Sequence, residues 1–287
     1  MVPTIRTVTL LLTMLGAGPV RPAATTHTGE RERAAYSFGV VPQFEQRKLN
    51  AIWNPIVTEV SRRTGLPLEL VTTLAIDDFE REFVGERFDF VYMNPYHVLK
   101  AKNYVPLVAD DAPLRGILVV RRDDPIDSLA SLDGKVVAFP SPNAVGASLL
   151  MRADLERLHH AKVTPLYVKT HSSVYLHVAK GLVAAGGGVE KSLAEQPQAV
   201  RDALRVLYTS RGVPSHPIAA HARVPAADSQ KLREALLAMD ATPEGRALLA
   251  AIPSQKLVRD GRAEYEPMRA WGLEAYWVDF WKESPGR

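Results

Sequence analysis

The sequence predicts an α/β fold built on parallel sheets. Short apolar segments alternate with longer amphipathic segments along most of the chain. The apolar segments have the length of buried strands, and the amphipathic segments repeat their apolar residues at helical spacing. This alternation is typical of strand–helix–strand units, in which neighbouring strands pair in parallel.

The individual elements follow from apolar runs bounded by turn residues. The predicted strands cover residues 36–42, 66–73, 88–94, 105–109, 115–122, 136–139, 163–170, 182–188 and 205–210. The predicted helices cover residues 45–65, 77–87, a segment from Pro95, 146–158, 171–181, 225–247 and 263–282. Gly65 is a typical helix end, and Asn94 followed by Pro95 is a typical helix start.

One strand–helix junction has unusual turn chemistry. Residues 134–155 read GKVVAFPSPNAVGASLLMRADL, so a Pro-Ser-Pro-Asn turn separates the strand from the helix. Ser141 and Asn143 are good N-cap residues, and Pro142 suits a first helical position. The first turn of a helix also presents unpaired N–H groups at the positive end of the dipole, where an anion can bind. The pattern therefore fits either an ordinary capped helix or an anion site.

The composition is that of a globular protein with one large domain or two smaller ones. The chain has 287 residues, of which 46% are hydrophobic and 23% are charged, with a net charge of +3. Nearly balanced charge predicts no nucleic-acid partner. The absence of cysteine excludes disulfides, thiol catalysis, cysteine-bound metals and a lipid anchor on an N-terminal cysteine.

The first two dozen residues look like a secretory signal peptide. Arg6 precedes an apolar run from Val8 to Leu15, followed by small residues. The run is too short to span a bilayer as a permanent helix. We therefore expect residues 1–24 to be removed on export, although Arg21 and Pro22 are unusual before a cleavage site. The alternative is a disordered tail.

Five segments, taken in order, resemble one protein family. They are SFGVVPQ, DFVYMNPYH within residues 77–99, SLASLDGKVVAFPSPNAVGASLL, KTHSSVYLHVAKGLVAAGGGVEKSL and LYTSRGVPSHPIAA. Over roughly residues 36–250 they resemble the phosphonate, phosphite and phosphate-binding proteins of bacterial ABC importers. The resemblance implies a type II periplasmic binding-protein fold, in which two crossover strands join two α/β lobes around a ligand cleft. Lobe 1 would comprise residues 36–114 and 213–287, and lobe 2 residues 115–212.

The resemblance also implies a set of ligand-binding residues. In the family, hydroxyls and backbone N–H groups at the matching helix start hold an oxyanion. Here that start reads Asn143, Ala144, Val145 and Gly146, so the hydroxyls are missing, while Asn143 and the backbone can still donate. The alternative for this segment is a plain helix cap.

Four further positions complete the predicted site. Tyr96 matches a region where the family uses an aromatic ligand contact, although a tyrosine packed at a helix start is the alternative. His171 matches a family histidine and can donate to an anion, or it can share a helix cap with its neighbours. Gly187 and Gly188 indicate close approach, either of a ligand or of packed helices.

The acids that relatives use for aminophosphonates are missing. The family tends to place them near Ala184 and His216, and Glu190 is the nearby candidate that remains, unless it faces solvent beside Lys191. A buried ammonium needs such a partner, so the sequence predicts a ligand without an amine.

We therefore expect an extracytoplasmic, monomeric solute-binding protein for phosphate, phosphite or an alkylphosphonate. It would deliver its ligand to the membrane permease of an ABC importer and use no cofactor or metal. The alternative is a periplasmic sensing domain that reports to a membrane kinase. An enzyme is disfavoured, because the sequence has no Gly-x-Ser-x-Gly elbow, no cysteine and no histidine pattern with metal-ligand spacing.

Overall fold

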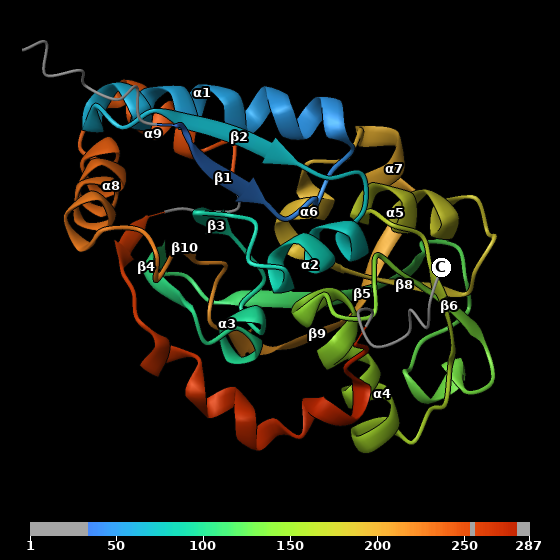
Figure 1. Cartoon of the computed structure of the whole chain (residues 1–287). Helices are drawn as coiled ribbons and strands as arrows, with labels where there is room; N and C mark the ends of the chain where they lie inside the picture. Colours follow the sequence, from blue (N-terminus) through green and yellow to red (C-terminus); the bar gives the residue numbers. More distant parts are fainter. Residues whose placement is uncertain (1–33, 253–255, 280–287) are drawn as a thin grey trace, which may run out of the picture. The chain divides into compact units, whose positions relative to one another are not determined.

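The chain forms two β-sheets joined by two strand-like crossings. The computed structural model describes residues 34–252 and 256–279, so the predicted signal peptide at residues 1–24 lies outside the described residues. All described residues belong to one compact unit that begins at Ala34. Figure 1 shows the arrangement of its helices and strands.

The first sheet has six strands in the order β11-β4-β10-β3-β1-β2. Strand β1 pairs in parallel with β2 and β3, whereas β10 is antiparallel to β3 and β4, and β11 is antiparallel to β4. The strands are β1 (Tyr36–Val40), β2 (Leu68–Thr72), β3 (Phe90–Tyr92), β4 (Tyr104–Asp110), β10 (Ile218–His221) and β11 (Leu257–Arg259).

The second sheet has five strands in the order β7-β6-β8-β5-β9. Strand β6 is parallel to β7 and β8, and β5 is antiparallel to β8 and β9. The strands are β5 (Leu114–Arg121), β6 (Val136–Phe139), β7 (Thr164–Tyr167), β8 (Ala185–Val189) and β9 (Leu204–Val213).

Both sheets are therefore mixed, and the prediction of parallel sheets was wrong in this respect. The chain passes from β4 to β5 through residues 111–113 and returns from β9 to β10 through residues 214–217. Strands β5 and β10 each arrive from the other sheet without a preceding helix, and both pair antiparallel. Alternating strands and helices in a sequence indicate parallel strands that are linked by helices. They do not reveal a strand that enters from the other sheet without a helix before it.

The helices cover both sheets. They are α1 (Gln46–Thr64), α2 (Ile76–Val84), α3 (His97–Lys100), α4 (Leu150–His159), α5 (His171–Ala179), α6 (Glu190–Ala194), α7 (Gln198–Asp202), α8 (Ala226–Met239) and α9 (Pro243–Leu249). Helix α1 ends at Gly65 in a left-handed conformation, with φ of 68°, as its sequence predicts. The single helix predicted at 225–247 is two helices, because Thr242 caps a new helix that begins at Pro243.

The predicted helix at 263–282 is described as far as residue 279, and over that part the chain forms three short 3₁₀ helices instead. They cover Arg262–Glu264, Glu266–Trp271 and Leu273–Tyr276. Pro267 removes a backbone donor, and Gly272 has a left-handed φ of 65°, so the segment cannot continue as one regular helix.

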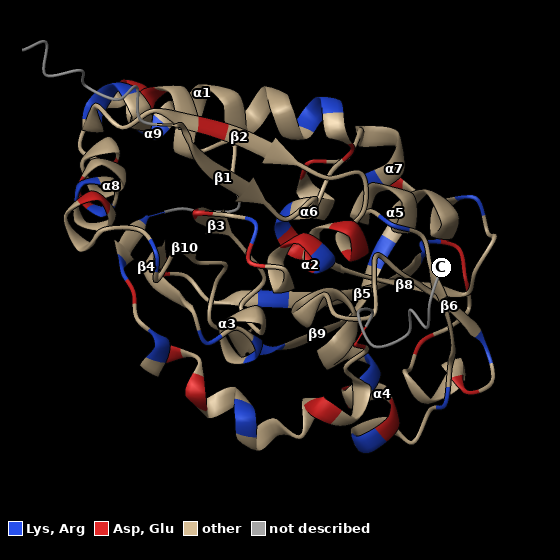
Figure 2. Ribbon diagram, in the orientation of Figure 1, with Lys and Arg blue, Asp and Glu red and all other residues tan. Residues whose placement is uncertain are grey.

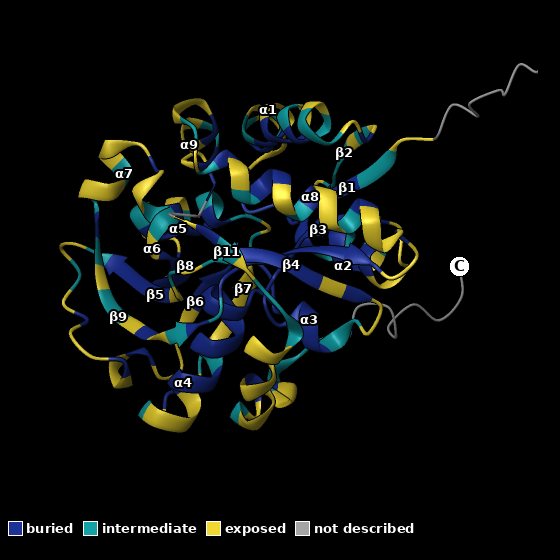
Figure 3. Cartoon of the chain, turned by 90° about the vertical axis from the view of Figure 1, so that its left-hand side faces the viewer, coloured by how far each residue is buried: buried dark blue, intermediate teal, exposed yellow. Residues whose placement is uncertain are grey.

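Below, "lobe 1" denotes the six-stranded sheet with its helices, and "lobe 2" the five-stranded sheet with its helices. Figure 3 shows β4 and β5 almost entirely buried and the outer helices partly exposed. The largest apolar cluster belongs mainly to lobe 1, yet it includes Val145, Leu149 and Leu150 from the start of a lobe 2 helix. The two lobes therefore share an apolar contact beside that helix start.

Charged residues of both signs are interspersed along the helices of both lobes (Figure 2). No helix in the described ranges has both the length and the apolar character required to cross a membrane.

Candidate functional site

A small cavity lies where the two lobes meet. Its volume is about 20 Å³. The lining comprises Val41, Gln43, Ile76, Asn94, Leu114, Ala144, Val145, Gly146, Ala147, His171, Val189 and His216.

The position of the cavity follows from the strand directions. Gln43 lies beyond the carboxyl end of β1, Asn94 beyond β3, Ala144 beyond β6, and His171 beyond β7. Ligands of α/β proteins bind at the carboxyl ends of parallel strands, and here the ends of two sheets face one another. The cavity is therefore the position at which this fold is expected to hold a small molecule.

The helix after β6 begins with an unusual turn. Residues Val145–Leu149 form a π-helix that leads directly into α4, and the carbonyl of Ala144 accepts from both Ser148 N, at 2.8 Å, and Leu149 N, at 3.0 Å. Among the described residues no side chain caps this start, so neither Ser141 nor Asn143 serves as the N-cap that its residue type would suit. The first N–H groups of a helix have no partner within it, and Val145, Gly146 and Ala147 line the cavity.

His171 presents its ring to the cavity from the start of α5. Its Nδ1 lies 3.0 Å from Ser192 Oγ, which lies 2.7 Å from the Tyr175 hydroxyl. These bonds fix the ring orientation, and no described residue bonds its Nε2. Burial lowers the pKa of His171 to about 4, so the ring is neutral at pH 7.

Gln43, Asn94 and His216 supply the other polar side chains of the cavity. Gln43 Nε2 lies 3.3 Å from His216 Nε2, and the His216 ring stacks on Tyr92 at 5.3 Å between centroids. Asn94 is held in place, because its Oδ1 accepts from Tyr96 N at 3.0 Å and its Nδ2 donates to Asn143 O at 3.1 Å. No carboxylate of residues 34–252 or 256–279 lines the cavity.

The structure brings four of the eight predicted site residues to this cavity. Ala144, Val145, Gly146 and His171 line it, whereas Tyr96, Asn143, Gly187 and Gly188 do not.

The side chain of Asn143 is fully engaged elsewhere. Its Nδ2 donates to Glu80 Oε2 and to Val278 O, both at 2.8 Å, and its Oδ1 accepts from Val278 N at 2.9 Å. Asn143 thus connects lobe 2 to α2 and to the C-terminal segment. Both N–H groups of its amide are used, so none is left to donate to an anion in this arrangement.

The Tyr96 hydroxyl also points away from the cavity. It donates to Glu274 Oε1 at 2.8 Å, and the ring packs against Trp277 at 5.4 Å between centroids. Burial and then the bond to Glu274 raise the pKa of Tyr96 well above its usual range. The packing interpretation of this residue therefore fits the structure better than a ligand contact.

Packed helices explain the glycines of β8. A Cβ atom on Gly187 would lie 1.9 Å from Ala147 O, and one on Gly188 would lie 2.0 Å from the Tyr175 hydroxyl. Glycine therefore lets the π-helix and α5 sit directly on the sheet. Of the two explanations for these glycines, close helix packing is the one that the contacts support.

Glu80 is a buried acid that sequence reasoning missed. It is 1% exposed, and its Oε1 lies 2.9 Å from His97 Nε2. Its burial could have been inferred from the sequence, because its spacing from Ile76 and Phe83 places it on the apolar face of α2. The sequence analysis did not identify Gln43 and His216 as cavity residues. They lie far from His171 in the sequence, and only the two chain crossings bring them close to it.

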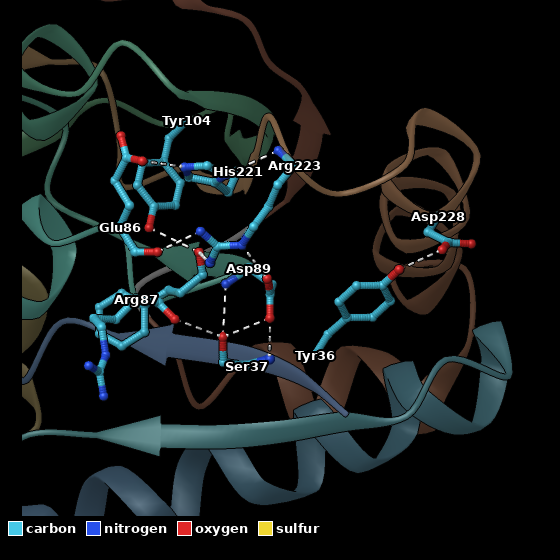
Figure 4. Close-up of polar contacts among 10 residues, drawn as sticks. Tyr36, Ser37, Glu86, Arg87, Asp89, Tyr104, His221, Arg223 and Asp228 are labelled. Carbon is cyan, nitrogen blue, oxygen red and sulfur yellow. Dashed lines mark hydrogen bonds and ion pairs between the residues drawn. The ribbon is translucent and has the colours of Figure 1, made fainter. Parts of the chain in front are cut away.

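A second polar cluster lies at the opposite ends of the same strands. Figure 4 shows Asp89 between Ser37 and Arg223, with His221 beside Glu86. Asp89 accepts from Ser37 N at 2.9 Å and from Arg223 Nε at 2.7 Å. Burial raises the pKa of Asp89, but the bonds from Arg223 and Ser37 outweigh burial and lower it overall. This network joins β1, β3 and the end of β10, and so stabilises lobe 1 away from the cavity.

Residues 262–278, here called the C-terminal strap, contact both lobes. In Figure 1 the strap runs from near β4 towards α4. On lobe 1, Glu274 accepts from Tyr96 and from Lys100 Nζ at 2.9 Å. On lobe 2, Arg157 donates to the carbonyls of Trp271 and Gly272 at 2.8 and 2.7 Å.

Further bonds fasten the end of the strap to lobe 2. Arg152 Nη2 donates to Tyr276 O at 2.7 Å, and the Tyr276 hydroxyl donates to Glu156 Oε2 at 2.9 Å. Together with Asn143, these contacts make the strap a second connection between the lobes, beside the two chain crossings.

Comparisons with known proteins identify the family. Residues 38–265 match the model of the family described as ABC transporter, phosphonate, periplasmic substrate-binding protein. No curated protein sequence matches the chain.

Solved structures show the same fold. A binding-protein component of an ABC phosphonate transporter from Pseudomonas aeruginosa is 18% identical, with a TM-score of 0.72 over 83% of this chain and 85% of that one. PhnD1 from Prochlorococcus marinus, solved with methylphosphonate, is 13% identical, with a TM-score of 0.76 over 84% of this chain and 98% of that one. A Xanthomonas citri protein bound to chloride is 17% identical, with a TM-score of 0.67 over 84% and 98%.

At these identities the structural likeness shows the fold alone, which is the two-lobed type II periplasmic binding-protein fold. The family match covers most of the chain. Its members are substrate-binding components of transporters and not enzymes, and they are periplasmic. The chain therefore belongs to the family of periplasmic substrate-binding proteins of phosphonate ABC transporters.

Proposed function

We propose that the cavity between the lobes binds a small tetrahedral oxyanion without an amine, such as an alkylphosphonate, phosphite or phosphate. The protein would deliver this ligand to the permease of an ABC importer. The observation that carries the proposal is the meeting of His171 with the first turn of the helix at 145–159 around one cavity. The complex of PhnD1 from Prochlorococcus marinus with methylphosphonate supports the same ligand class.

The donors around the cavity suit an oxyanion. The first-turn N–H groups of Val145, Gly146 and Ala147 can point hydrogen bonds at an anion, and the helix dipole favours negative charge there. His171 adds the Nε2 atom of a ring whose Nδ1 is held by Ser192. Hydrogen bonds to a charged oxygen are about twice as strong as those between neutral groups, so these donors can replace the hydration shell of the anion.

The absence of a lining carboxylate disfavours an amine. Glu190 is exposed and lines a neighbouring groove of about 340 Å³ rather than the cavity. Glu80 does not line the cavity either, and His97 and Asn143 already occupy its two oxygens. An ammonium group in the cavity would therefore lose its hydration without gaining a charged partner.

The size of the cavity implies that the lobes move to admit the ligand. A volume of about 20 Å³ holds about one water molecule, which is less than a tetrahedral oxyanion needs. Residues 111–113 and 214–217 connect the lobes, so they are the natural hinge. This hinge supports a division close to residues 36–114 plus 213–287 and residues 115–212, which we propose as the two moving bodies. Leu114 and Val213 at the boundary pair with each other in the second sheet.

A thermal-shift experiment tests the proposed function. Methylphosphonate, phosphite and phosphate are each added to the ligand-free mature protein, with 2-aminoethylphosphonate as the matched amine. A ligand at 100 times its Kd stabilises the folded state by about 2.7 kcal/mol, so at least one amine-free oxyanion should raise the melting temperature clearly. The proposal fails if none of the three does so, or if 2-aminoethylphosphonate gives the largest shift.

We also propose that residues 1–24 direct export and are then removed. Arg6 and the apolar run that follows it support this proposal. N-terminal sequencing of the protein from a periplasmic extract is the test, and an intact Met1 would contradict it.

A further inference from the structure

His216 combines two properties that set it apart from other buried polar residues. It lines the cavity, and its Nδ1 is buried without a hydrogen-bond partner among the described residues. The other buried side-chain atoms without such a partner belong to residues that do not line the cavity: His97, Ser148, Arg152, His221 and Arg233. Buried polar groups are normally paired, so an unpaired one at a candidate site calls for an explanation.

The neighbours of His216 determine which ring nitrogen carries the proton. Gln43 Nε2 lies 3.3 Å from His216 Nε2, and an amide nitrogen can only donate. His216 Nε2 therefore accepts, and the neutral ring carries its proton on Nδ1. The unpaired atom is thus an N–H donor rather than an acceptor.

The ring is fixed in this orientation. It stacks on Tyr92 of β3 with an interplanar angle of 20°, and the side chain is 8% exposed. His216 lies in the crossing between β9 and β10, whereas His171 comes from lobe 2. The cavity therefore receives one histidine from lobe 2 and one from a hinge segment.

We propose that His216 is a second ligand-contacting residue, whose Nδ1–H donates to an oxygen of the oxyanion and selects against a ligand that carries an amine at that place. This inference rests on the proposed function. An oxyanion supplies the acceptor that the buried N–H lacks, while an ammonium group would face a donor. Movement of the hinge would carry His216 towards or away from the helix start, so the contact would couple binding to the lobe arrangement.

Three variants of His216 test whether its N–H group matters for binding or whether the side chain only fills space. His216→Asn keeps an N–H near the position of Nδ1, His216→Leu keeps bulk without a donor, and His216→Asp replaces the donor with a charged acceptor. His177→Asn is the control, because His177 lies in the same helix as His171 but outside the cavity. Each variant and the unchanged protein are titrated calorimetrically with methylphosphonate and with 2-aminoethylphosphonate.

The variants should differ in how much affinity for methylphosphonate they lose. His216→Leu should weaken methylphosphonate binding about 10- to 100-fold, as for a lost hydrogen bond to a charged group. His216→Asn should stay within about threefold of the unchanged protein, as should His177→Asn. His216→Asp should weaken methylphosphonate binding at least as much as His216→Leu and should shift the affinity ratio towards 2-aminoethylphosphonate.

The outcomes distinguish this inference from the proposed function. If the unchanged protein binds methylphosphonate and His216→Leu binds it equally well, His216 is not a ligand contact and the inference alone fails. If His216→Asn loses as much affinity as His216→Leu while both remain folded by circular dichroism, the N–H group is not what matters, and the inference again fails. If the unchanged protein binds none of methylphosphonate, phosphite and phosphate, both proposals fail together.

Discussion

The cavity and the C-terminal strap both join the two lobes, but they use their polar side chains in opposite ways. At the strap, the Asn143 amide donates both N–H groups, to Glu80 and to Val278 O, and its oxygen accepts from Val278 N. At the cavity, His216 keeps an N–H that no described residue bonds, and His171 has only one ring nitrogen bonded within the described part of the chain. A satisfied polar group stabilises a joint, whereas an unsatisfied one is available to a ligand.

The difference also changes which predicted residues belong to the ligand site. Tyr96 and Asn143 follow strands in the way that ligand residues do, yet their side chains serve the strap. Their ligand-binding role stays a prediction that the contacts disfavour. Each of the following variants or conditions perturbs either the cavity or the strap contacts and leaves the other region unchanged.

The largest expected effect is a loss of stability at low pH that originates in the cavity. Burial lowers the pKa of His171 to about 4, and burial with neighbouring His171 and His97 lowers that of His216 to about 3, from an ordinary 6.5. Below pH 6.5 the unfolded chain binds protons that the folded protein refuses, so stability falls as pH falls. Each histidine contributes up to about 1.4 kcal/mol per pH unit, or roughly 3–4 kcal/mol together between pH 7 and 5.

Urea denaturation at pH 7 and pH 5 measures this loss. The double variant His171→Asn/His216→Asn should show a correspondingly smaller loss, because it lacks the two titrating groups. Saturating methylphosphonate should also reduce the loss, since an anion favours the protonated rings. Equal pH dependence in the double variant and the unchanged protein would mean that the cavity histidines are not buried in neutral form.

The second effect comes from the strap. Asn143→Ala removes three hydrogen bonds and leaves the buried Glu80 carboxylate with one partner fewer, so we expect a loss of about 2–3 kcal/mol in the free energy of unfolding. Asn103→Ala is the matched control, because Asn103 is exposed. If Asn143→Ala proved no less stable than Asn103→Ala, the strap would not be the joint described above.

The smallest effect concerns Tyr96. Tyr96→Phe keeps the packing against Trp277 and removes only the bond to Glu274, which retains Lys100 as a partner. We expect the free energy of unfolding to fall by about 1 kcal/mol, measured by the same denaturation experiment. A much larger loss would indicate a role in the strap beyond this single bond.

Much of the fold could be predicted from the sequence, because many of its helices and strands follow from patterns of neighbouring residues. The run at 136–139 matches β6, and Gly65 and His171 mark the end of α1 and the start of α5 as expected. The antiparallel direction of β5 and β10 could not be predicted, since it depends on how the chain crosses between the sheets.

The site was predicted only in part for a similar reason. The sequence indicates which residues follow a strand, and among the predicted site residues Ala144 to Gly146 and His171 are the ones that line the cavity. It does not indicate which side chains find partners within the protein. The bond of Tyr96 to Glu274 joins residues 178 positions apart, and that of Asn143 to Val278 joins residues 135 apart. Such long-range partners decide between a ligand contact and a structural joint.

The most direct measurement compares His171→Ala with Tyr96→Phe in calorimetric titrations with methylphosphonate, alongside the unchanged protein. His171 lines the cavity and Tyr96 belongs to the strap contact. We predict that His171→Ala weakens binding by about 1–3 kcal/mol, while Tyr96→Phe binds within about twofold of the unchanged protein. Equal loss in both variants, or a loss confined to Tyr96→Phe, would contradict the assignment of the cavity as the ligand site.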